Sequence, residues 1–340
     1  MKSRSGTTRR SFLRRSGLFA SAAVVGPSVM LIGRMALAAS DWPTRPITLI
    51  VPFPAGGSSD ALARAMARHV EQKTSQVVVV DNRAGAGGTI GVRAVANAEP
   101  DGYTFGWTIG SSMNQSRVMY KSLPYNPDKD FVFAGAVDTA GLTLAVHKGV
   151  PARNLAELIE MGKKQPVNIG SYGPGSFPHM FVQQVNKLYG TQFQAVHYKG
   201  ETPMWQDLAG GQVHAAIGSY GSFRPFLERG DIRPIGQGGK ERLPVMPDLP
   251  LFSEEGFKED VFTISTGWIG LIAPAATPKP IVERMSELFV EAFSAGDGAQ
   301  LLATRGLYGP VMDATAHNTW QREQGAATIE LVKQLGITLD

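Results

Sequence analysis

The chain has 340 residues, of which 43% are hydrophobic and 18% are charged, a composition typical of a globular protein with one or two full cores. Seven of its 33 basic residues lie within residues 1–38, which hold no acidic residue, so the rest of the chain has 26 basic and 29 acidic residues and a net charge of −3. A basic surface for nucleic acid is therefore not expected, and the absence of cysteine excludes disulfides, thiolate nucleophiles and cysteine-ligated zinc.

The first 38 residues have the features of an export signal. Residues 8–14 read TRRSFLR, and paired arginines followed by x-Phe-Leu and a basic residue are typical of the twin-arginine route. The apolar segment at 17–32 is shorter than the about 20 residues that a membrane-spanning helix needs. Small residues at Ala36 and Ala38 predict cleavage near Ala38, which would release a soluble protein into the periplasm.

Strand and helix patterns alternate at the start of the predicted mature chain. Short apolar and β-branched runs predict strands at 47–51, 77–80 and 104–108. Helices are predicted between them, one from the four-residue spacing of Leu62, Met66 and Val70 and one at 90–98. This βαβαβ order implies a parallel sheet covered by helices.

A second series of strands and helices follows. Strands are predicted at 142–146, 168–171, 194–197 and 215–217. The helices between and after them are predicted at 155–164, 177–189, 204–208 and 222–228. A late strand at 268–273 precedes helices at 281–295 and 315–335. Because no low-complexity linker separates the two series, we expect two lobes that are joined by crossing strands.

Three glycine-rich turns, at 52–60, 82–89 and 170–176, each connect the end of a predicted strand to the start of a predicted helix. Glycine lets the backbone approach a ligand closely, and the N–H groups and dipole at a helix start favour an anion. Ligands of open parallel sheets bind beyond the carboxyl ends of the strands. We therefore expect all three turns to border one cleft that binds a carboxylate.

No pattern indicates a cofactor or a metal. The string GAGGTIG at 85–91 fits a dinucleotide fingerprint poorly because its last spacing is one residue too long, and no P-loop or histidine metal-ligand spacing occurs. Ser176 and His179 lie three residues apart at a predicted helix start, which leaves an exported serine hydrolase open. A helix-capping serine above a helix-facing histidine also explains this pair, and no G-x-S-x-G motif presents a nucleophile.

A series of short motifs runs along the chain. They are IVPFPAGG at 50–57, NRAGAGG at 82–88, PDGYT at 100–104, GPGS at 173–176 with His179, YKG at 198–200 with Pro203, DL at 207–208, GQV at 211–213, and Trp268 with GL at 270–271, AP at 273–274 and TP at 277–278. Taken in this order, the motifs resemble those of the tripartite tricarboxylate transporter receptors, also called the Bug family. The resemblance covers the whole predicted mature chain.

The resemblance implies an α/β protein of the type II periplasmic-binding-protein fold, with two lobes that each hold a mainly parallel sheet flanked by helices. Lobe 1 would comprise 39–141 and 267–340, lobe 2 would comprise 142–266, and strands near 139–142 and 265–268 would form the hinge. The implied protein is a monomeric, non-catalytic receptor that delivers a small organic acid to a membrane permease of one large and one small subunit. A ligand-sensing partner of a signalling receptor would share this fold and is the other alternative.

Carried over by position, the resemblance also implies ligand-binding residues. In lobe 1 they are Phe53, Ala55, Gly56, Gly57, Ser58, Gly87, Gly88, Thr89 and Ser111. In lobe 2 they are Ser171, Gly175, Ser176, His179, Tyr198 and Gly218. Relatives commonly carry an acidic residue at the end of the strand after the Gly-x-Val motif, where this chain has Gly218 and Ser219. An amino group on the ligand would lose its partner there, so we expect a plain carboxylate or an aromatic acid.

Overall fold

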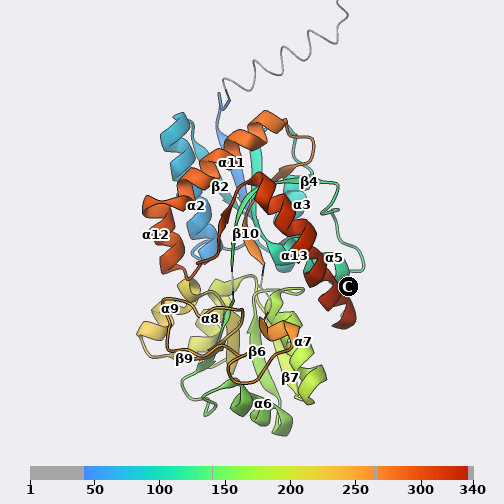
Figure 1. Cartoon of the computed structure of the whole chain (residues 1–340), viewed down its shortest axis with the longest axis vertical. Coiled ribbons are helices and arrows are strands. Elements are labelled where there is room, and N and C mark those ends of the chain that lie inside the picture. The colour runs from blue at the N-terminus through green and yellow to red at the C-terminus, as the bar shows by residue number, and fades with distance from the viewer. Residues whose placement is uncertain (1–41, 140, 264–266, 336–340) are drawn as a thin grey trace, which may run out of the picture. The chain divides into compact units, whose positions relative to one another are not determined.

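The computed structural model describes residues 42–139, 141–263 and 267–335, and within them it shows two α/β lobes that are each built on one sheet (Figure 1). The predicted export signal at 1–38 lies outside the described residues. Within the part of the chain that is described, no helix has the length and apolar character needed to cross a bilayer.

The sheet of lobe 1 has six strands in the order β11-β4-β10-β3-β1-β2. These strands are β1 (Ile47–Val51), β2 (Val78–Asn82), β3 (Thr104–Ile109), β4 (Phe131–Asp138), β10 (Trp268–Pro274) and β11 (Val311–Met312). β1 pairs in parallel with β2 and β3, and β4 runs in the same direction because both β3 and β4 are antiparallel to β10. β10 is reversed because it brings the chain back from the other lobe.

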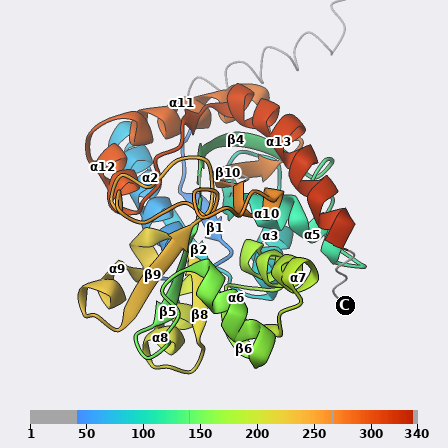
Figure 2. The same cartoon turned by 60° about the horizontal axis from the view of Figure 1, so that its bottom comes forward.

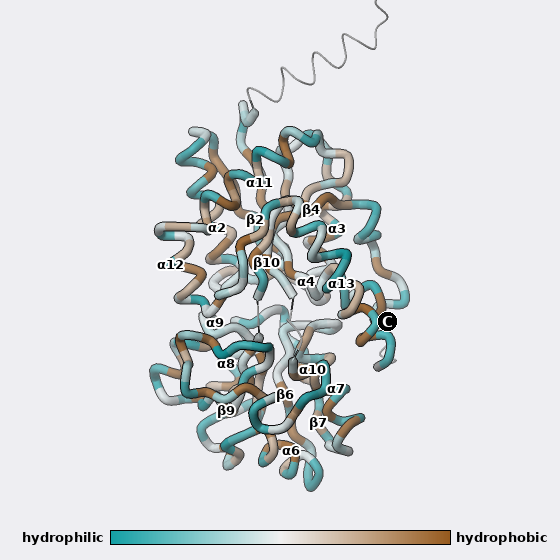
Figure 3. The backbone as a smooth tube through the Cα atoms, in the orientation of Figure 1, coloured by the Kyte–Doolittle hydropathy of each residue, from teal (hydrophilic) through white to brown (hydrophobic). Residues whose placement is uncertain are grey.

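Helices cover this sheet and bury its apolar side chains. They are α2 (Ser58–Thr74), the 3-10 turn η1 (Ala86–Gly88), α3 (Thr89–Ala96), α4 (Gly110–Met113), α5 (Gln115–Met119), α11 (Lys279–Ser294), α12 (Gly296–Thr304) and α13 (Ala314–Leu335). α11 and α13 both pack against β4 (Figure 2). Under α11, the buried ring of Trp107 lies 5.9 Å from that of Phe289 and 5.8 Å from that of Phe293. Hydrophobic and hydrophilic residues alternate along the outer helices, as expected when one side of each helix is buried (Figure 3).

The sheet of lobe 2 has five strands in the order β7-β6-β8-β5-β9. They are β5 (Thr143–His147), β6 (Val167–Ser171), β7 (Phe193–His197), β8 (Ala215–Gly218) and β9 (Ile232–Gln237). The helices of this lobe are α6 (Leu155–Lys164), α7 (Phe177–Tyr189), α8 (Glu201–Ala209), α9 (Tyr220–Glu228) and α10 (Asp260–Thr263). β6 is parallel to β7 and β8, whereas β5 is antiparallel to both β8 and β9.

The predicted fold class is confirmed. Among the described strands, four of six in lobe 1 and four of five in lobe 2 run in one direction, so each sheet is mainly parallel. The reversed strands in the interior of the sheets are β10 and β5, which directly follow the two crossings between the lobes. The crossings therefore place the carboxyl ends of the parallel strands of both lobes toward each other.

The long helix α13 contacts both lobes. Near its start, Trp320 Nε1 donates to Asp138 Oδ2 at the end of β4, at 3.0 Å. Near its end, Leu331 and Val332 are buried in the hydrophobic core of lobe 2, and the helix lies beside α7 (Figure 1). α13 is therefore a third connection between the lobes, in addition to the two crossings.

Candidate functional site

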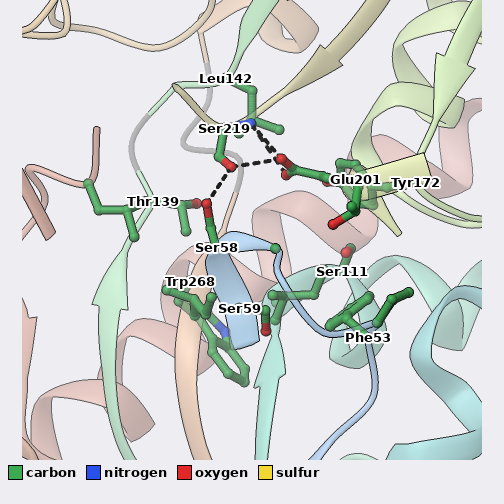
Figure 4. Close-up of a pocket in the computed structure, with 17 residues that line it drawn as sticks. Phe53, Ser58, Ser59, Ser111, Thr139, Leu142, Tyr172, Glu201, Ser219 and Trp268 are labelled. Atoms are coloured by element: carbon green, nitrogen blue, oxygen red, sulfur yellow. Dashed lines mark hydrogen bonds between the residues drawn. The ribbon is translucent and has the colours of Figure 1, made fainter. Parts of the chain in front are cut away.

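A cavity of about 90 Å³ lies between the two lobes (Figure 4). From lobe 1 it is lined by Phe53, Pro54, Gly57, Ser58, Ser59, Ile109, Gly110, Ser111, Thr139, Trp268, Ile269 and Leu307. From lobe 2 it is lined by Leu142, Tyr172, Glu201, Thr202 and Ser219. Each ordered water needs about 10–15 Å³ of such space, so the cavity suits a small molecule rather than a peptide.

The beginnings of several helices gather around this cavity. α2 begins at Ser58, α4 at Gly110 and α8 at Glu201, and Ser219 directly precedes α9. The first N–H groups of a helix have no partner within the helix, so these ends bring hydrogen-bond donors to the cavity. The prediction that all three glycine-rich turns border one cleft holds in part: the first turn lines the cavity and the third contributes Tyr172, whereas no residue of the second turn is in the lining. The beginnings of α4, α8 and α9 at the cavity were not predicted.

Ser59 gives the cavity an unfilled hydrogen-bonding group. Its Oγ is buried, yet it has no hydrogen-bond partner among the described residues. A buried hydroxyl without a partner costs about 1–3 kcal/mol, so such groups are rare unless a ligand or water engages them. The start of α2 is therefore a place where a ligand oxygen would be stabilised.

The two lobes are in direct contact beside the cavity. Ser58 Oγ lies 3.0 Å from Ser219 Oγ and 3.1 Å from Ser222 Oγ, and Ser58 N donates to Ser222 Oγ at 3.4 Å. These hydrogen bonds connect the start of α2 in lobe 1 with the start of α9 in lobe 2. The structure is thus a closed form of the two-lobed fold.

The second and third glycine-rich turns form another contact between the lobes. A Cβ added at Gly87 would lie 2.5 Å from Pro174 O, and one added at Gly173 would lie 2.8 Å from Gly87 Cα. Gly87 also has a φ of +64°, which favours glycine. These turns need glycine because their backbones touch across the gap between the lobes.

The predicted site residues divide into two groups. Phe53, Gly57, Ser58 and Ser111 line the cavity. Outside its lining lie Ala55, Gly56, Gly87, Gly88, Thr89, Ser171, Gly175, Ser176, His179, Tyr198 and Gly218. Whether any of these residues contacts a ligand stays a prediction.

At two strand ends of lobe 2, the residue directly after the predicted one lines the cavity. Ser171, the last residue of β6, is buried and its Oγ lies 2.9 Å from Ser176 Oγ, whereas the next residue, Tyr172, lines the cavity. Gly218 packs against Trp205 and the next residue, Ser219, lines the cavity. In both cases the residue that lines the cavity is the first one after the strand.

Tyr198 and His179 are engaged within lobe 2. Tyr198 Oη donates to Asp207 Oδ2 at 2.9 Å, and burial together with this carboxylate raises the pKa of Tyr198 to about 12. His179 Nδ1 accepts from Gly175 N at 3.2 Å, and its ring centroid lies 4.6 Å from that of His197. Burial, with a smaller effect of His197, lowers the pKa of His179 to about 4, so the ring is neutral near pH 7 and supports the turn above it.

Glu201 brings to the cavity a carboxyl group that the sequence did not predict. Its Oε2 accepts from Ser219 Oγ at 2.7 Å and from Ser219 N at 3.1 Å (Figure 4). It also accepts from Trp205 Nε1 at 3.3 Å. Burial raises the pKa of Glu201, while these hydrogen bonds oppose the shift. The strand end at Gly218 and Ser219 lacks an acidic side chain, as the sequence shows, but helix α8 places the carboxyl group of Glu201 beside Ser219. The only sequence signal is an acidic residue directly after Gly200, at a helix start.

Two lobes with mainly parallel sheets, two crossings between them and a small cavity where the sheets face each other define the type II periplasmic-binding-protein fold. The family model described as "Tripartite tricarboxylate transporter family receptor" matches residues 62–337. The chain belongs to this family of receptors, as the Bug-type motifs predicted. The protein BugT of Bordetella pertussis is 33% identical over 297 residues, which cover 83% of this chain and 90% of BugT.

Solved structures agree with this assignment. The structure of R. palustris Rpa4515 with adipate is 32% identical, has a TM-score of 0.81, and matches 88% of this chain and 100% of that chain. The structure of MatC from Rhodopseudomonas palustris with bound malate is 26% identical, has a TM-score of 0.77, and matches 86% of this chain and 100% of that chain.

Proposed function

We propose that this protein is a periplasmic receptor that captures a small carboxylate between its lobes and delivers it to a tripartite tricarboxylate-type permease of one large and one small membrane subunit. Membership in the receptor family supports this role, and similar structures are described with adipate and with malate. The observation that carries the proposal is the unpartnered Ser59 hydroxyl at the start of α2, in the cavity between the lobes.

In the proposed binding mode, the ligand carboxylate faces the first turn of α2. The N–H groups of that turn and the positive end of a 17-residue helix favour negative charge, and Ser59 Oγ can donate to it. No Lys or Arg is among the described residues that line the cavity, so main-chain N–H groups and hydroxyls are the donors.

Ligand binding is coupled to closure in this proposal. A ligand held by α2 gains contacts with lobe 2 only when the lobes meet, so it shifts the population toward the closed form. Of the predicted hinge near 139–142 and 265–268, residues 140, 265 and 266 lie outside the described residues. Thr139 N and Thr139 Oγ1 both donate to Gly267 O at 2.9 Å, so the two crossing segments lie side by side where they are described.

The remaining parts of the proposal come from the sequence. The twin-arginine signal would be cleaved near Ala38, and a soluble monomer would result. Its lobes would comprise 39–141 with 267–340, and 142–266.

The geometry around Ser176 does not favour the alternative of a serine hydrolase. Ser176 Oγ lies beside Ser171 Oγ, and His179 Nδ1 accepts from the backbone of Gly175. The contacts described for Ser176 and His179 thus join each to another partner, whereas a nucleophile and its base must be hydrogen-bonded to each other. A receptor role agrees with these contacts.

A thermal-shift screen with mono-, di- and tricarboxylates tests the proposed function. We expect at least one of them to raise the melting temperature, and we expect Ser59→Ala to weaken its binding about tenfold, because a hydrogen bond to a charged group is lost. Ser294→Ala, at an exposed serine far along α11, is the matched control and should bind as the wild type does. Stabilisation by uncharged compounds alone would refute the proposal.

A further inference from the structure

The cavity has two chemically different ends, and this inference rests on the proposed carboxylate function. The start of α2 offers hydrogen-bond donors, including the unpartnered hydroxyl of Ser59. On the side of lobe 2, the cavity presents the carboxyl group of Glu201, which the Ser219 hydroxyl connects to Ser58. In lobe 2, the N–H and hydroxyl donors of Ser219 are already used by Glu201. The donor end is therefore free for a ligand carboxylate, whereas the other end is an acceptor.

The carboxyl group of Glu201 is held by neutral donors of lobe 2. Its Oε2 accepts three hydrogen bonds, its Oε1 accepts that of Ser219 N at 3.3 Å, and the Ser222 hydroxyl adds a hydrogen bond that lowers the pKa of Glu201. None of these donors carries a charge, so they do not neutralise a carboxylate. Glu201 retains accessible surface and lines the cavity, so a ligand can approach its carboxyl group.

The negative charge of Glu201 also lacks a partner. Among the described ion pairs, none includes Glu201. The charge of Glu201 does act on Arg305 and raises its pKa, but burial has the larger effect and lowers the pKa of Arg305. Arg305 Nη1 instead donates to Gly221 O at 3.2 Å. An enclosed carboxylate without a cation is costly, and burial raises the pKa of Glu201 accordingly. A positively charged group on the ligand would offset this cost.

We propose that Glu201 makes the cavity selective for small organic acids that carry a protonated amino group, with the ligand carboxylate at the start of α2 and the ammonium group at Glu201. A second carboxylate at that end would be repelled by Glu201 at short range in a poorly solvated space. This assignment reverses the expectation that Gly218 and Ser219 leave the cleft without an acidic partner.

Two pairs of compounds with matched carbon skeletons test the selectivity: L-alanine against propionate, and L-aspartate against succinate. Their affinities are measured by calorimetry for the wild type, for Glu201→Gln, and for Glu160→Gln as a control at an exposed carboxylate of lobe 2. In the wild type and in Glu160→Gln, we expect the amino compound of at least one pair to bind ten times or more tightly than its partner. In Glu201→Gln, that preference should disappear, because the neutral amide no longer pairs with the ammonium group.

The possible outcomes are distinct. If the plain acids bind as tightly as the amino acids, or if Glu201→Gln keeps the preference, the proposed role of Glu201 is wrong while the carboxylate function stands. If neither these compounds nor any carboxylate of the thermal-shift screen binds, the carboxylate function fails, and the role of Glu201 fails with it.

Discussion

Gly87→Ala is expected to weaken ligand binding about thirty- to a hundredfold. The added Cβ would lie 2.5 Å from Pro174 O in the other lobe, and because this carbonyl belongs to the backbone, the lobes must move apart. Separation would break the hydrogen bonds of Ser58 with Ser219 and Ser222. At about 1 kcal/mol each, these three bonds contribute about 2–3 kcal/mol to closure, which corresponds to the expected loss of affinity. Calorimetry with the carboxylate that gives the largest thermal shift measures this loss.

Gly190→Ala is the matched control for backbone strain. Gly190 has a φ of +68°, close to the +64° of Gly87, and a Cβ there would have nothing within 4 Å. Both variants should lose about 1–2 kcal/mol of stability, since alanine is disfavoured in this conformation. Only Gly87→Ala should lose affinity and show an enlarged radius of gyration in X-ray scattering with ligand. Equal affinity in the two variants would mean that the contact between the glycine-rich turns is not needed for binding.

The second large effect is expected from His317, in α13. Its side chain is fully buried between the rings of Phe133 and Trp268, with centroid distances of 4.9 and 4.2 Å, and neither ring nitrogen has a hydrogen-bond partner among the described residues. Burial lowers the pKa of His317 to about 3, and the nearby backbone of Gly135 opposes this shift only weakly. The folded protein therefore holds this ring neutral.

The direction of the pH dependence follows from that shift. In the unfolded chain His317 takes up a proton below pH 6.5, whereas in the folded protein it does so only near pH 3. Its contribution to the free energy of unfolding is thus complete above about pH 6.5 and falls by about 1.4 kcal/mol per pH unit as the pH decreases toward 3. From pH 6.5 to pH 5, we expect a loss of about 2 kcal/mol from this residue alone.

His317→Phe isolates this contribution, because phenylalanine keeps a ring but cannot be protonated. Urea unfolding at pH 7.5, 6 and 5 should show that the stability of the variant relative to the wild type increases as the pH falls. The pKa values of His179 and His197 are also lowered, but both proteins share those residues, so their effects cancel in the difference. Parallel stability curves for the two proteins would contradict the assignment.

Local signals were sufficient to predict many elements of the fold. The helix at 155–164 was predicted with the bounds of α6, and in the structure Asn154 caps its start, because Asn154 Oδ1 accepts from Glu157 N at 2.8 Å. Three strands were not predicted, namely β4, β9 and the two-residue β11. In β4, Gly135 interrupts the apolar run near an irregularity in its pairing with β10. In β9, Pro234 breaks the pattern, and it is tolerated because β9 is an edge strand.

The site was less predictable than the fold, because it depends on contacts between residues distant in sequence. The turn before α2 could be predicted to border the ligand cleft, because it places glycine and serine at a helix start, and it does line the cavity. Which of two neighbours at a strand end faces the gap, such as Ser171 or Tyr172, depends on the path of the turn that follows, where Ser171 Oγ lies beside Ser176 Oγ. Glu201 reaches Ser219 because α8 and α9 begin side by side. No local sequence pattern predicts this contact.

The helix α13 limits the kind of opening that this protein can undergo. Between Trp320, which contacts lobe 1, and Val332, which is buried in the core of lobe 2, the helix spans about 18 Å. A clamshell movement that pulled its end away would transfer Leu331 and Val332 into water, at about 1.5–3 kcal/mol for each side chain. A twist of the lobes about an axis near α13 would keep both side chains buried. The entrance to the cavity should therefore widen on the side of the molecule away from α13, and solutes would enter and leave on that side.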